Sequence, residues 1–208
     1  MRGAAVSVAQ LSHCVALQIS EFQNCNVLFL QHAAALSVMA APAPLRWKPP
    51  NVANLKLNID ATTTSTLNCS GFGFIVHNSA GEVMASGGYS RAYSDNIYML
   101  ESQVILFALI CAKNAGFKCL EVESHSSLVV SQLQQYCPSR EVNDLVLNDI
   151  RHLAPSFELL SFSYIPRSCN VIADKLSKWA LHLPLDCLIL EEVPSCIGLD
   201  VVAEVSSS

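Results

Sequence analysis

The stretch Leu55-Lys56-Leu57-Asn58-Ile59-Asp60 alternates apolar and polar side chains and ends in an acid. Alternation with a period of two is typical of a β-strand with one buried face, here that of Leu55, Leu57 and Ile59. Turn-like residues 61–70 follow, and then two further strand patterns joined by a hairpin loop. These strands are predicted at Gly71–His77 and Glu82–Ser86, with the loop at Asn78–Gly81, and Gly87 and Gly88 close the series.

Helical and strand patterns alternate through the rest of the chain. The helix predicted at Tyr98–Asn114 has candidate caps at Ser94–Asn96 and is expected to end at Gly116. The later elements are a strand at Phe117–Glu123, helices at Ser126–Gln135 and Val142–Leu153, a strand at Phe157–Ile165 and a helix at Asn170–Leu181. Three hairpin-linked antiparallel strands followed by helix-separated strands predict an α/β fold with a mixed five-stranded sheet and flanking helices.

The 208 residues suffice for one domain with a substantial core plus extensions. We predict an apolar, low-charge extension at residues 1–45, a domain at 46–182 and an acidic, loosely held tail at 183–208. The net charge of −5 belongs to that tail, because residues 46–181 hold equal numbers of basic and acidic side chains. The domain therefore has no basic surplus for strong non-specific nucleic-acid binding.

The first 45 residues allow several interpretations. Polar residues interrupt the uncharged run of residues 22–45 and prolines end it, so no integral membrane span is expected. A secretory signal fits poorly, and an organellar transit peptide fits slightly better because the segment is poor in acids. We prefer an extension that packs partly on the domain.

Nine cysteines occur in the chain, and they form no C-x-x-C pair. A zinc site is therefore not expected. Their odd number and the apolar surroundings of Cys111 and Cys119 favour buried free thiols in a reducing, intracellular compartment. A secreted disulfide framework is the alternative.

Four short stretches place ionisable residues at strand ends or on predicted helices. In chain order they are Lys56–Asp60, Leu100–Ser102, Glu121–Ser126 and Pro166–Leu176. Together they resemble the type 1 ribonuclease H fold, in which acidic side chains from strands and helices meet around divalent metal. The leading Trp47-Lys48-Pro49-Pro50 and the closing Asn170–Leu181 are similar to retroelement-derived, reverse transcriptase-like domains of plants. The resemblance covers about residues 46–182.

This resemblance implies that Asp60, Glu101 and Asp174 are catalytic ligands of Mg²⁺ or Mn²⁺. Hydrolysis with two metals needs several carboxylates in one small volume, so residues distant in sequence must converge. Each acid also has an ordinary explanation. Asp60 can form a turn, Glu101 can favour a helix N-terminus, and Asp174 can be an exposed residue near a helix start.

His125 stands where the family pattern has its third carboxylate. Imidazole binds Mn²⁺ or Zn²⁺ but is a poor ligand of Mg²⁺, so weakened or lost Mg²⁺ catalysis is expected. Glu123 shares a strand face with His125 by the period of two, which makes it a candidate for partial compensation. The alternative is a His125 that caps the next helix or is simply exposed.

Two positions before the last predicted helix also bear on activity. Arg167 is the basic residue nearest the predicted site, and we expect it to contact substrate phosphate; a solvated loop charge is the alternative. Some ribonucleases H carry a His in this loop, whereas Pro166–Asn170 has none. Tyr164 occupies a strand position where such relatives often have His.

Three functions remain open at this point. The first is metal-dependent cleavage of the RNA strand in RNA–DNA hybrids, weakened by His125. The second is an inactive retroelement-derived domain that retains some nucleic-acid binding. The third is a protein-interaction module with an apolar extension. The sequence does not specify the oligomeric state.

Overall fold

The computed structural model describes residues 46–135 and 144–205. The predicted extension at residues 1–45 lies outside the described residues. The order of elements is β1 (Leu55–Thr64), β2 (Cys69–His77), β3 (Val83–Ala92), α2 (Ile97–Asn114), β4 (Cys119–Ser124), α3 (Ser127–Gln134), α4 (Asp144–Leu153), β5 (Leu159–Tyr164), α5 (Val171–Ala180), β6 (Cys187–Leu190) and α6 (Gly198–Val205). The α/β fold predicted from the sequence is therefore confirmed.

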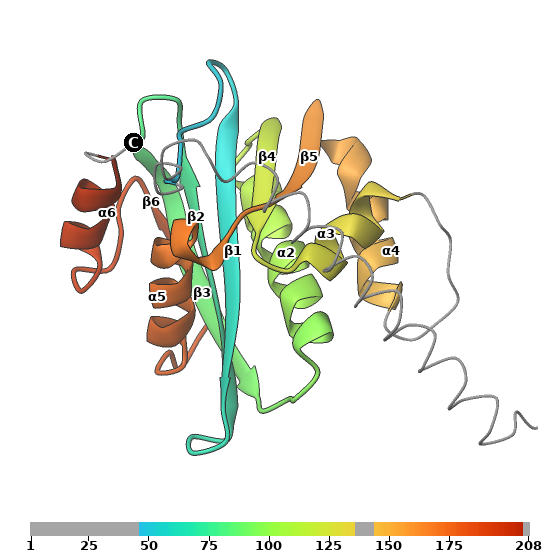
Figure 1. Cartoon of the computed structure of the whole chain (residues 1–208), viewed down its shortest axis with the longest axis vertical. Helices are drawn as coiled ribbons and strands as arrows, with labels where there is room; N and C mark the ends of the chain where they lie inside the picture. The colour runs from blue at the N-terminus through green and yellow to red at the C-terminus, as the bar shows by residue number, and fades with distance from the viewer. Residues whose placement is uncertain (1–45, 136–143, 206–208) are drawn as a thin grey trace, which may run out of the picture. The chain divides into compact units, whose positions relative to one another are not determined.

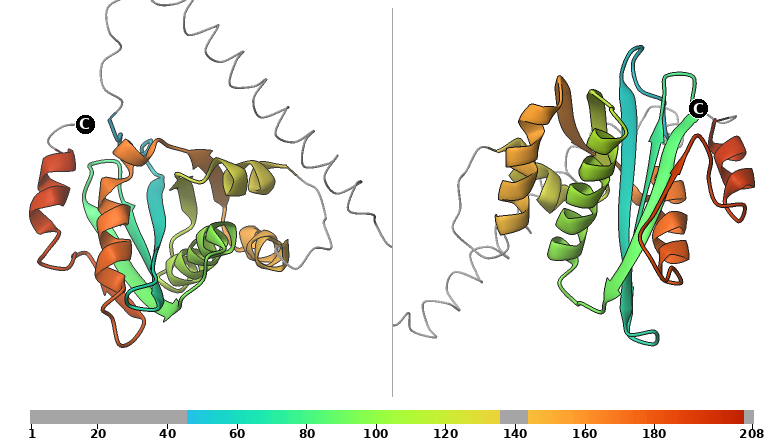
Figure 2. Two further views of the ribbon diagram at one scale, coloured as in Figure 1. Left: turned by 60° about the horizontal axis from the view of Figure 1, so that its bottom comes forward. Right: turned by 180° about the vertical axis from the view of Figure 1, so that it is seen from behind.

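One mixed sheet has the strand order β5-β4-β1-β2-β3-β6. The three hairpin-linked strands β1, β2 and β3 are antiparallel, whereas β4 pairs in parallel with both β1 and β5. Helices α2, α3 and α4 lie on one side of the sheet, and α5 and α6 lie on the other (Figures 1 and 2). Strand β1 therefore runs through the interior of the sheet, with helices on both faces.

Strand β1 is longer than the sequence predicted. It continues through the β-branched run Thr62–Thr64 before the hairpin, so Asp60 lies inside the strand and not at its end. Leu57 and Ile59 are fully buried, as the alternation predicted. The prediction that Gly87 and Gly88 end the hairpin series is also wrong, because β3 passes through both glycines to Ala92.

Glycines on β2 allow α5 to lie directly on the sheet. A Cβ atom on Gly71 would come within 2.2 Å of the Ser177 backbone oxygen, and one on Gly73 within 2.2 Å of the Ser177 backbone nitrogen. Only glycine permits this backbone approach. The close contact places the middle of α5 beside Asp60, which β1 presents on the same face of the sheet.

The segment predicted to be a loosely held tail contributes a sixth strand, so the five-stranded prediction is one strand short. Strand β6 pairs antiparallel with β3, from Ala85–Leu190 to Gly88–Cys187. Ile197 is 2% exposed and packs against Ile75, Ile172 and Leu176. Of the prolines that suggested a tail, Pro184 is exposed, whereas Pro194 is buried and its carbonyl accepts a hydrogen bond from the Ile197 backbone. The hydrophobic effect stabilises the segment on the fold.

Helix α2 provides much of the core on the other side of the sheet. Asn96 caps its N-terminus, because the Asn96 side chain accepts a hydrogen bond from the backbone of Met99. It is the one described helix that is long and apolar enough to match a membrane span. Val104, Ile105 and Ala108 are completely buried against the sheet, which accounts for this apolar composition. The described cysteines are free thiols, of which Cys111 and Cys169 are buried.

Candidate metal site

Asp60 projects from the middle of β1 into a fully buried position. The hydroxyl of Ser177 on α5 donates a hydrogen bond to Asp60 Oδ2 at 2.7 Å. Ser177 was not predicted as a site residue, although it lies one turn after Asp174 between the apolar residues Leu176 and Ala180. Its bond fixes one carboxylate oxygen of Asp60 and leaves the other directed away from α5.

Glu101 is the fifth residue of α2, and its side chain is buried against the sheet. It lies beyond the first turn, so helix-dipole placement does not explain it. Ser124 at the end of β4 donates a hydrogen bond to Glu101 Oε2 at 3.3 Å. The pKa of Glu101 is raised to about 7, chiefly by burial; His125 opposes the increase and the nearby Asp60 carboxylate adds to it.

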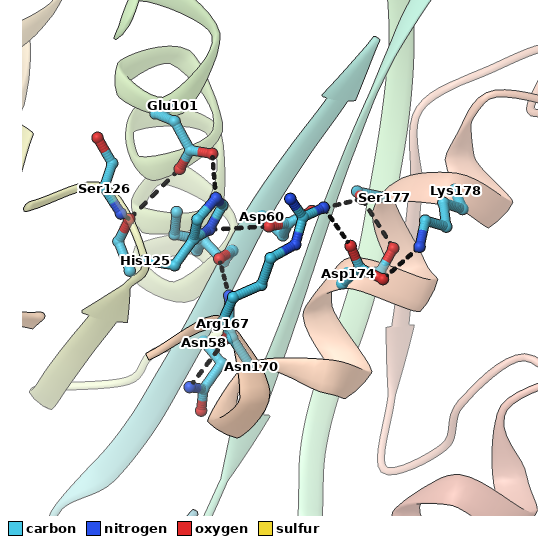
Figure 3. Close-up of polar contacts among 12 residues, drawn as sticks. Asn58, Asp60, Glu101, His125, Ser126, Arg167, Asn170, Asp174, Ser177 and Lys178 are labelled. Atoms are coloured by element: carbon cyan, nitrogen blue, oxygen red, sulfur yellow. Dashed lines mark hydrogen bonds and ion pairs between the residues drawn. The ribbon is translucent and has the colours of Figure 1, made fainter. Parts of the chain in front are cut away.

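His125 directly follows β4 and lies between the two acids (Figure 3). Its Nδ1 atom is 3.0 Å from Asp60 Oδ1, and its Nε2 atom is 3.7 Å from Glu101 Oε1. The ring N–H groups are not aligned with these oxygens, so the contacts are not hydrogen bonds and become ion pairs when the ring is protonated. The contact with Asp60 raises the pKa of His125 against the effect of burial, and Glu101 adds to the increase.

These three residues form what we call the three-residue site. One ligand atom each from Asp60, Glu101 and His125 lie within 4.8 Å of one another. In the described part of the chain, Asp60 Oδ1, Glu101 Oε1 and His125 Nδ1 are buried without a hydrogen-bond partner. Buried polar atoms without partners are costly, and a divalent cation would satisfy two carboxylate oxygens and a ring nitrogen together. The residues therefore fit a metal ion.

Asp174, the third predicted metal ligand, is not a member of this group. Its Oδ1 atom accepts a hydrogen bond from Arg167 Nη2 at 2.7 Å, and its Oδ2 atom pairs with Lys178 Nζ one turn further along α5. Burial would raise the pKa of Asp174, but the bonds from Arg167 and Lys178 hold it below its usual value. Arg167, predicted to bind substrate phosphate, thus pairs with a carboxylate of its own chain.

Glu123 does not replace the missing carboxylate. Its Oε1 atom pairs with Lys56 Nζ at 2.8 Å, and its Oε2 atom accepts a hydrogen bond from Asn58 Nδ2 at 2.9 Å. Both carboxylate oxygens are therefore bound within a separate cluster. The candidate compensation by Glu123 finds no support in this geometry.

We call that group the Asn58 cluster; its members are Trp47, Lys56, Asn58, Glu123 and Asn170, and each is less than 9% exposed. Trp47 Nε1 donates to Asn58 Oδ1 at 3.0 Å. Asn58 Nδ2 also contacts Asn170 Oδ1 at 3.3 Å, and Asn170 Nδ2 donates to the Ile59 carbonyl at 2.8 Å. The cluster fixes the start of α5 against β1. Its members are distant in sequence, so the cluster can be recognised only in the folded structure.

Comparisons with known proteins agree with this architecture. The family model described as reverse transcriptase-like matches residues 58–180. Ribonuclease H1 from the archaeon Halobacterium salinarum NRC-1 has a similar structure, with a TM-score of 0.56 and 23% identity, over 62% of this chain and 98% of that one. The N-terminal ribonuclease H domain of a Mycobacterium tuberculosis protein has a TM-score of 0.55 and 21% identity, over 62% and 93% of the two chains.

A ribonuclease H1 from compost, solved in complex with an RNA/DNA hybrid, also has a TM-score of 0.55 and 21% identity, over 62% of this chain and 96% of that one. At these identities the structural likeness shows the fold. No curated protein sequence matches the chain.

Proposed function

We propose that this chain, which belongs to the reverse transcriptase-like family and has a ribonuclease H-like fold, hydrolyses the RNA strand of RNA–DNA hybrids. The hydrolysis would need a divalent cation. We further propose that His125 makes this activity weak with Mg²⁺ and stronger with Mn²⁺. Mg²⁺ prefers oxygen ligands, whereas Mn²⁺ accepts imidazole nitrogen more readily.

The observation that carries this proposal is the meeting of three buried ligand atoms, from β1, α2 and the end of β4, that have no hydrogen bond. Asp60, Glu101 and His125 are separated by 24 to 65 residues in sequence, and yet one ligand atom from each lies within 4.8 Å of the others. These atoms form ion pairs with one another but no hydrogen bond, whereas the buried polar side chains of the Asn58 cluster are hydrogen-bonded. Binding of a cation by these atoms would explain the missing hydrogen bonds.

Each neighbouring side chain has a definable part in such a site. Ser177 fixes the orientation of Asp60, and Ser124 fixes that of Glu101. These hydrogen bonds hold the carboxylates in place before a ligand arrives, which lowers the cost of binding. A bound cation would supply an activated water and charge stabilisation for in-line displacement at phosphate. Glu101 would bind it in the deprotonated form.

A hybrid-cleavage assay tests the proposal. The full chain is incubated with an RNA–DNA hybrid labelled on the RNA strand, in Mg²⁺ and separately in Mn²⁺. We expect feeble cleavage in Mg²⁺ and faster cleavage in Mn²⁺, with no cleavage of double-stranded DNA. Absence of cleavage in both metals, under conditions in which the protein binds the hybrid, would contradict the catalytic proposal.

A second candidate is a domain that binds nucleic acid without turnover, or a protein-interaction module. The pairing of Asp174 with Arg167 and Lys178 favours it, because a family ligand position is already occupied by internal cations. Hybrid affinity measured against salt concentration separates the two forms of this candidate. Binding that weakens steeply with salt indicates phosphate contacts, whereas no binding at low salt would exclude the nucleic-acid-binding form and leave the protein-interaction form.

A further inference from the structure

Both carboxylate oxygens of Asp174 are occupied by side chains of the same protein (Figure 3). We propose that Arg167 and Lys178 act as permanent counter-charges of Asp174, and that they limit the site to one divalent cation. That cation would be held by Asp60, Glu101 and His125. The inference rests on the proposed metal site, and it assigns to Arg167 and Lys178 the control of how many cations bind.

The pairing of Asp174 leaves little room for a metal ligand. The Asp174 side chain is only 16% exposed, and the Arg167 guanidinium and the Lys178 ammonium each contact a different oxygen. A cation that binds Asp174 would have to share an oxygen with one of these positive groups or displace it. Arginine does not lose its proton in proteins, so the displaced guanidinium would remain a positive charge beside the incoming ion.

Asp174 lies close enough to the three-residue site for this competition to matter. Ser177 Oγ donates to Asp60 Oδ2 and lies 2.9 Å from the Asp174 carbonyl, so one residue contacts both positions. The Arg167 guanidinium is directed toward the space between Asp60 and Asp174 (Figure 3). Arg167 also interacts electrostatically with Asp60 and Glu101. A second cation here would be repelled by two fixed positive charges.

The net charge of the site also favours the binding of a single divalent cation. Asp60, Glu101 and Asp174 contribute three negative charges when ionised, and Arg167 and Lys178 contribute two positive charges. The sum is −1 with a neutral His125, so one divalent cation brings the site to +1 and a second would bring it to +3. Without Arg167 and Lys178, two cations would give only +1, which favours the second ion.

Binding of Mn²⁺ to the full chain tests this inference without reference to cleavage. The free Mn²⁺ signal in electron paramagnetic resonance, together with calorimetry, gives the number of ions bound. We expect one Mn²⁺ per wild-type chain and two per chain carrying Arg167→Gln and Lys178→Gln. The first ion should also bind the double variant at least tenfold more tightly. Adding Asp174→Asn to the double variant should remove the second ion.

A matched control is available in the chain. The double variant Arg91→Gln, Lys175→Gln also loses two positive charges, from exposed pairs with Asp186 and Asp200 that lie outside the site. It should bind one Mn²⁺ with wild-type affinity. Arg167→Lys, which keeps the charge, should also bind one. The Arg167 and Lys178 side chains are themselves largely exposed, so their loss is not expected to unfold the domain.

Two results would overturn the inference. One is a wild-type chain that already binds two Mn²⁺ ions, and the other is an Arg167→Gln, Lys178→Gln chain that still binds only one. Either can occur while Asp60→Asn abolishes the first ion, in which case the proposed metal site stands and only the role of Arg167 and Lys178 fails. Two ions in the double variant would support the inference even if no variant cleaves a hybrid.

Discussion

Two polar clusters begin on β1 only two residues apart, and they differ in how completely their side chains are paired. Asn58 contacts Trp47, Glu123 and Asn170, and every contact is a hydrogen bond between buried groups. Asp60 has one oxygen bound by Ser177 and the other without a hydrogen bond among the described residues. The same strand and the same face thus carry one satisfied cluster and one unsatisfied site.

The difference separates stability from function. A satisfied buried network lowers the free energy of the folded state relative to any arrangement in which its members lose partners. An unsatisfied site raises that free energy, and such sites persist where a ligand supplies the missing contacts. We therefore expect substitutions in the Asn58 cluster to affect folding, and substitutions in the three-residue site to affect chemistry.

The largest effect is expected from Asp60→Asn. Replacing this ligand should lower Mn²⁺-dependent hybrid cleavage by on the order of 10³-fold, about 4 kcal/mol of barrier. The free energy of unfolding in the absence of metal should change by less than about 1 kcal/mol, because burying one charge fewer offsets the lost ion pair with His125, whose ring can then be neutral. Asp95→Asn, at an exposed position, is the control and should leave cleavage unchanged. A severe loss of stability in Asp60→Asn would contradict the proposed difference between the Asn58 cluster and the three-residue site.

Asn58→Ala should show the opposite behaviour. It removes the partner of the Trp47 ring N–H, of the Asn170 side-chain oxygen and of one Glu123 oxygen, so unfolding should become easier by about 3 kcal/mol. Urea titration measures this. Asn54→Ala removes an amide that also donates to a glutamate, Glu121, at 2.8 Å, but in a half-buried place. That control should cost less than about 1 kcal/mol, and equal costs for both variants would contradict the importance of burial.

His77, which lies beside the Asn58 cluster, is expected to make the free energy of unfolding depend on pH. It is fully buried against Trp47, and burial, with Lys56 adding to the effect, lowers the pKa of His77 to about 4. Between pH 6.5 and 4 the unfolded chain therefore binds more protons at His77 than the folded chain does, so the contribution of His77 to stability falls as the pH falls through this range. Glu101, whose pKa is raised, acts in the opposite direction, so the His77 part is the difference between the wild type and a His77 variant; from pH 6.5 to 5 it should be about 2 kcal/mol.

Thermal unfolding at several pH values measures this loss. The His77→Phe variant should lose this part of the pH dependence, whereas exposed His152→Gln should keep it. The same pH dependence from pH 6.5 to 5 in the wild type and in His77→Phe would show that His77 is already protonated in the folded protein.

The smallest of these effects is expected from His125→Asp. Restoring a carboxylate should raise Mg²⁺-dependent cleavage at least tenfold, about 1.4 kcal/mol of barrier, because Mg²⁺ prefers oxygen ligands. Initial rates in Mg²⁺ measure it, with His152→Asp as the control on an exposed helix position. Full activity of the wild type in Mg²⁺, unchanged by His125→Asp, would show that the imidazole does not limit the reaction.

Much of the fold is visible in local sequence patterns. The alternation at Leu55–Asp60 predicted β1, and an apolar helical pattern after the candidate caps Ser94–Asn96 predicted α2, with Asn96 as the cap in the structure. Strand β6 was missed because Pro184, Pro194 and the acids around them have the composition of a loose segment. Its place depends on the open edge of β3 and on the apolar surface that receives Ile197, and both are properties of the assembled domain.

The candidate site was predictable to a different extent. Motif order suggested that Asp60, Glu101 and His125 would meet, and the structure brings them together. It does not show Asp174 among them, because Arg167 and Lys178 bind both of its oxygens. The i,i+4 spacing of Asp174 and Lys178 was a signal for one of these pairs. The contact with Arg167 depends on how the loop before α5 folds, and no local pattern encodes it.

Strand β6 also has a consequence for how the protein is made. Because β6 follows the rest of the sheet in the chain, β3 is an open edge until residues 187–190 have left the ribosome. During that interval the apolar surface around Ile75 and Leu176 also lacks its cover from Ile197. Exposed strand edges and apolar surface promote association between nascent chains. Synthesis that stalls after residue 182 would therefore leave a product prone to aggregation, even though every residue of the three-residue site is already present.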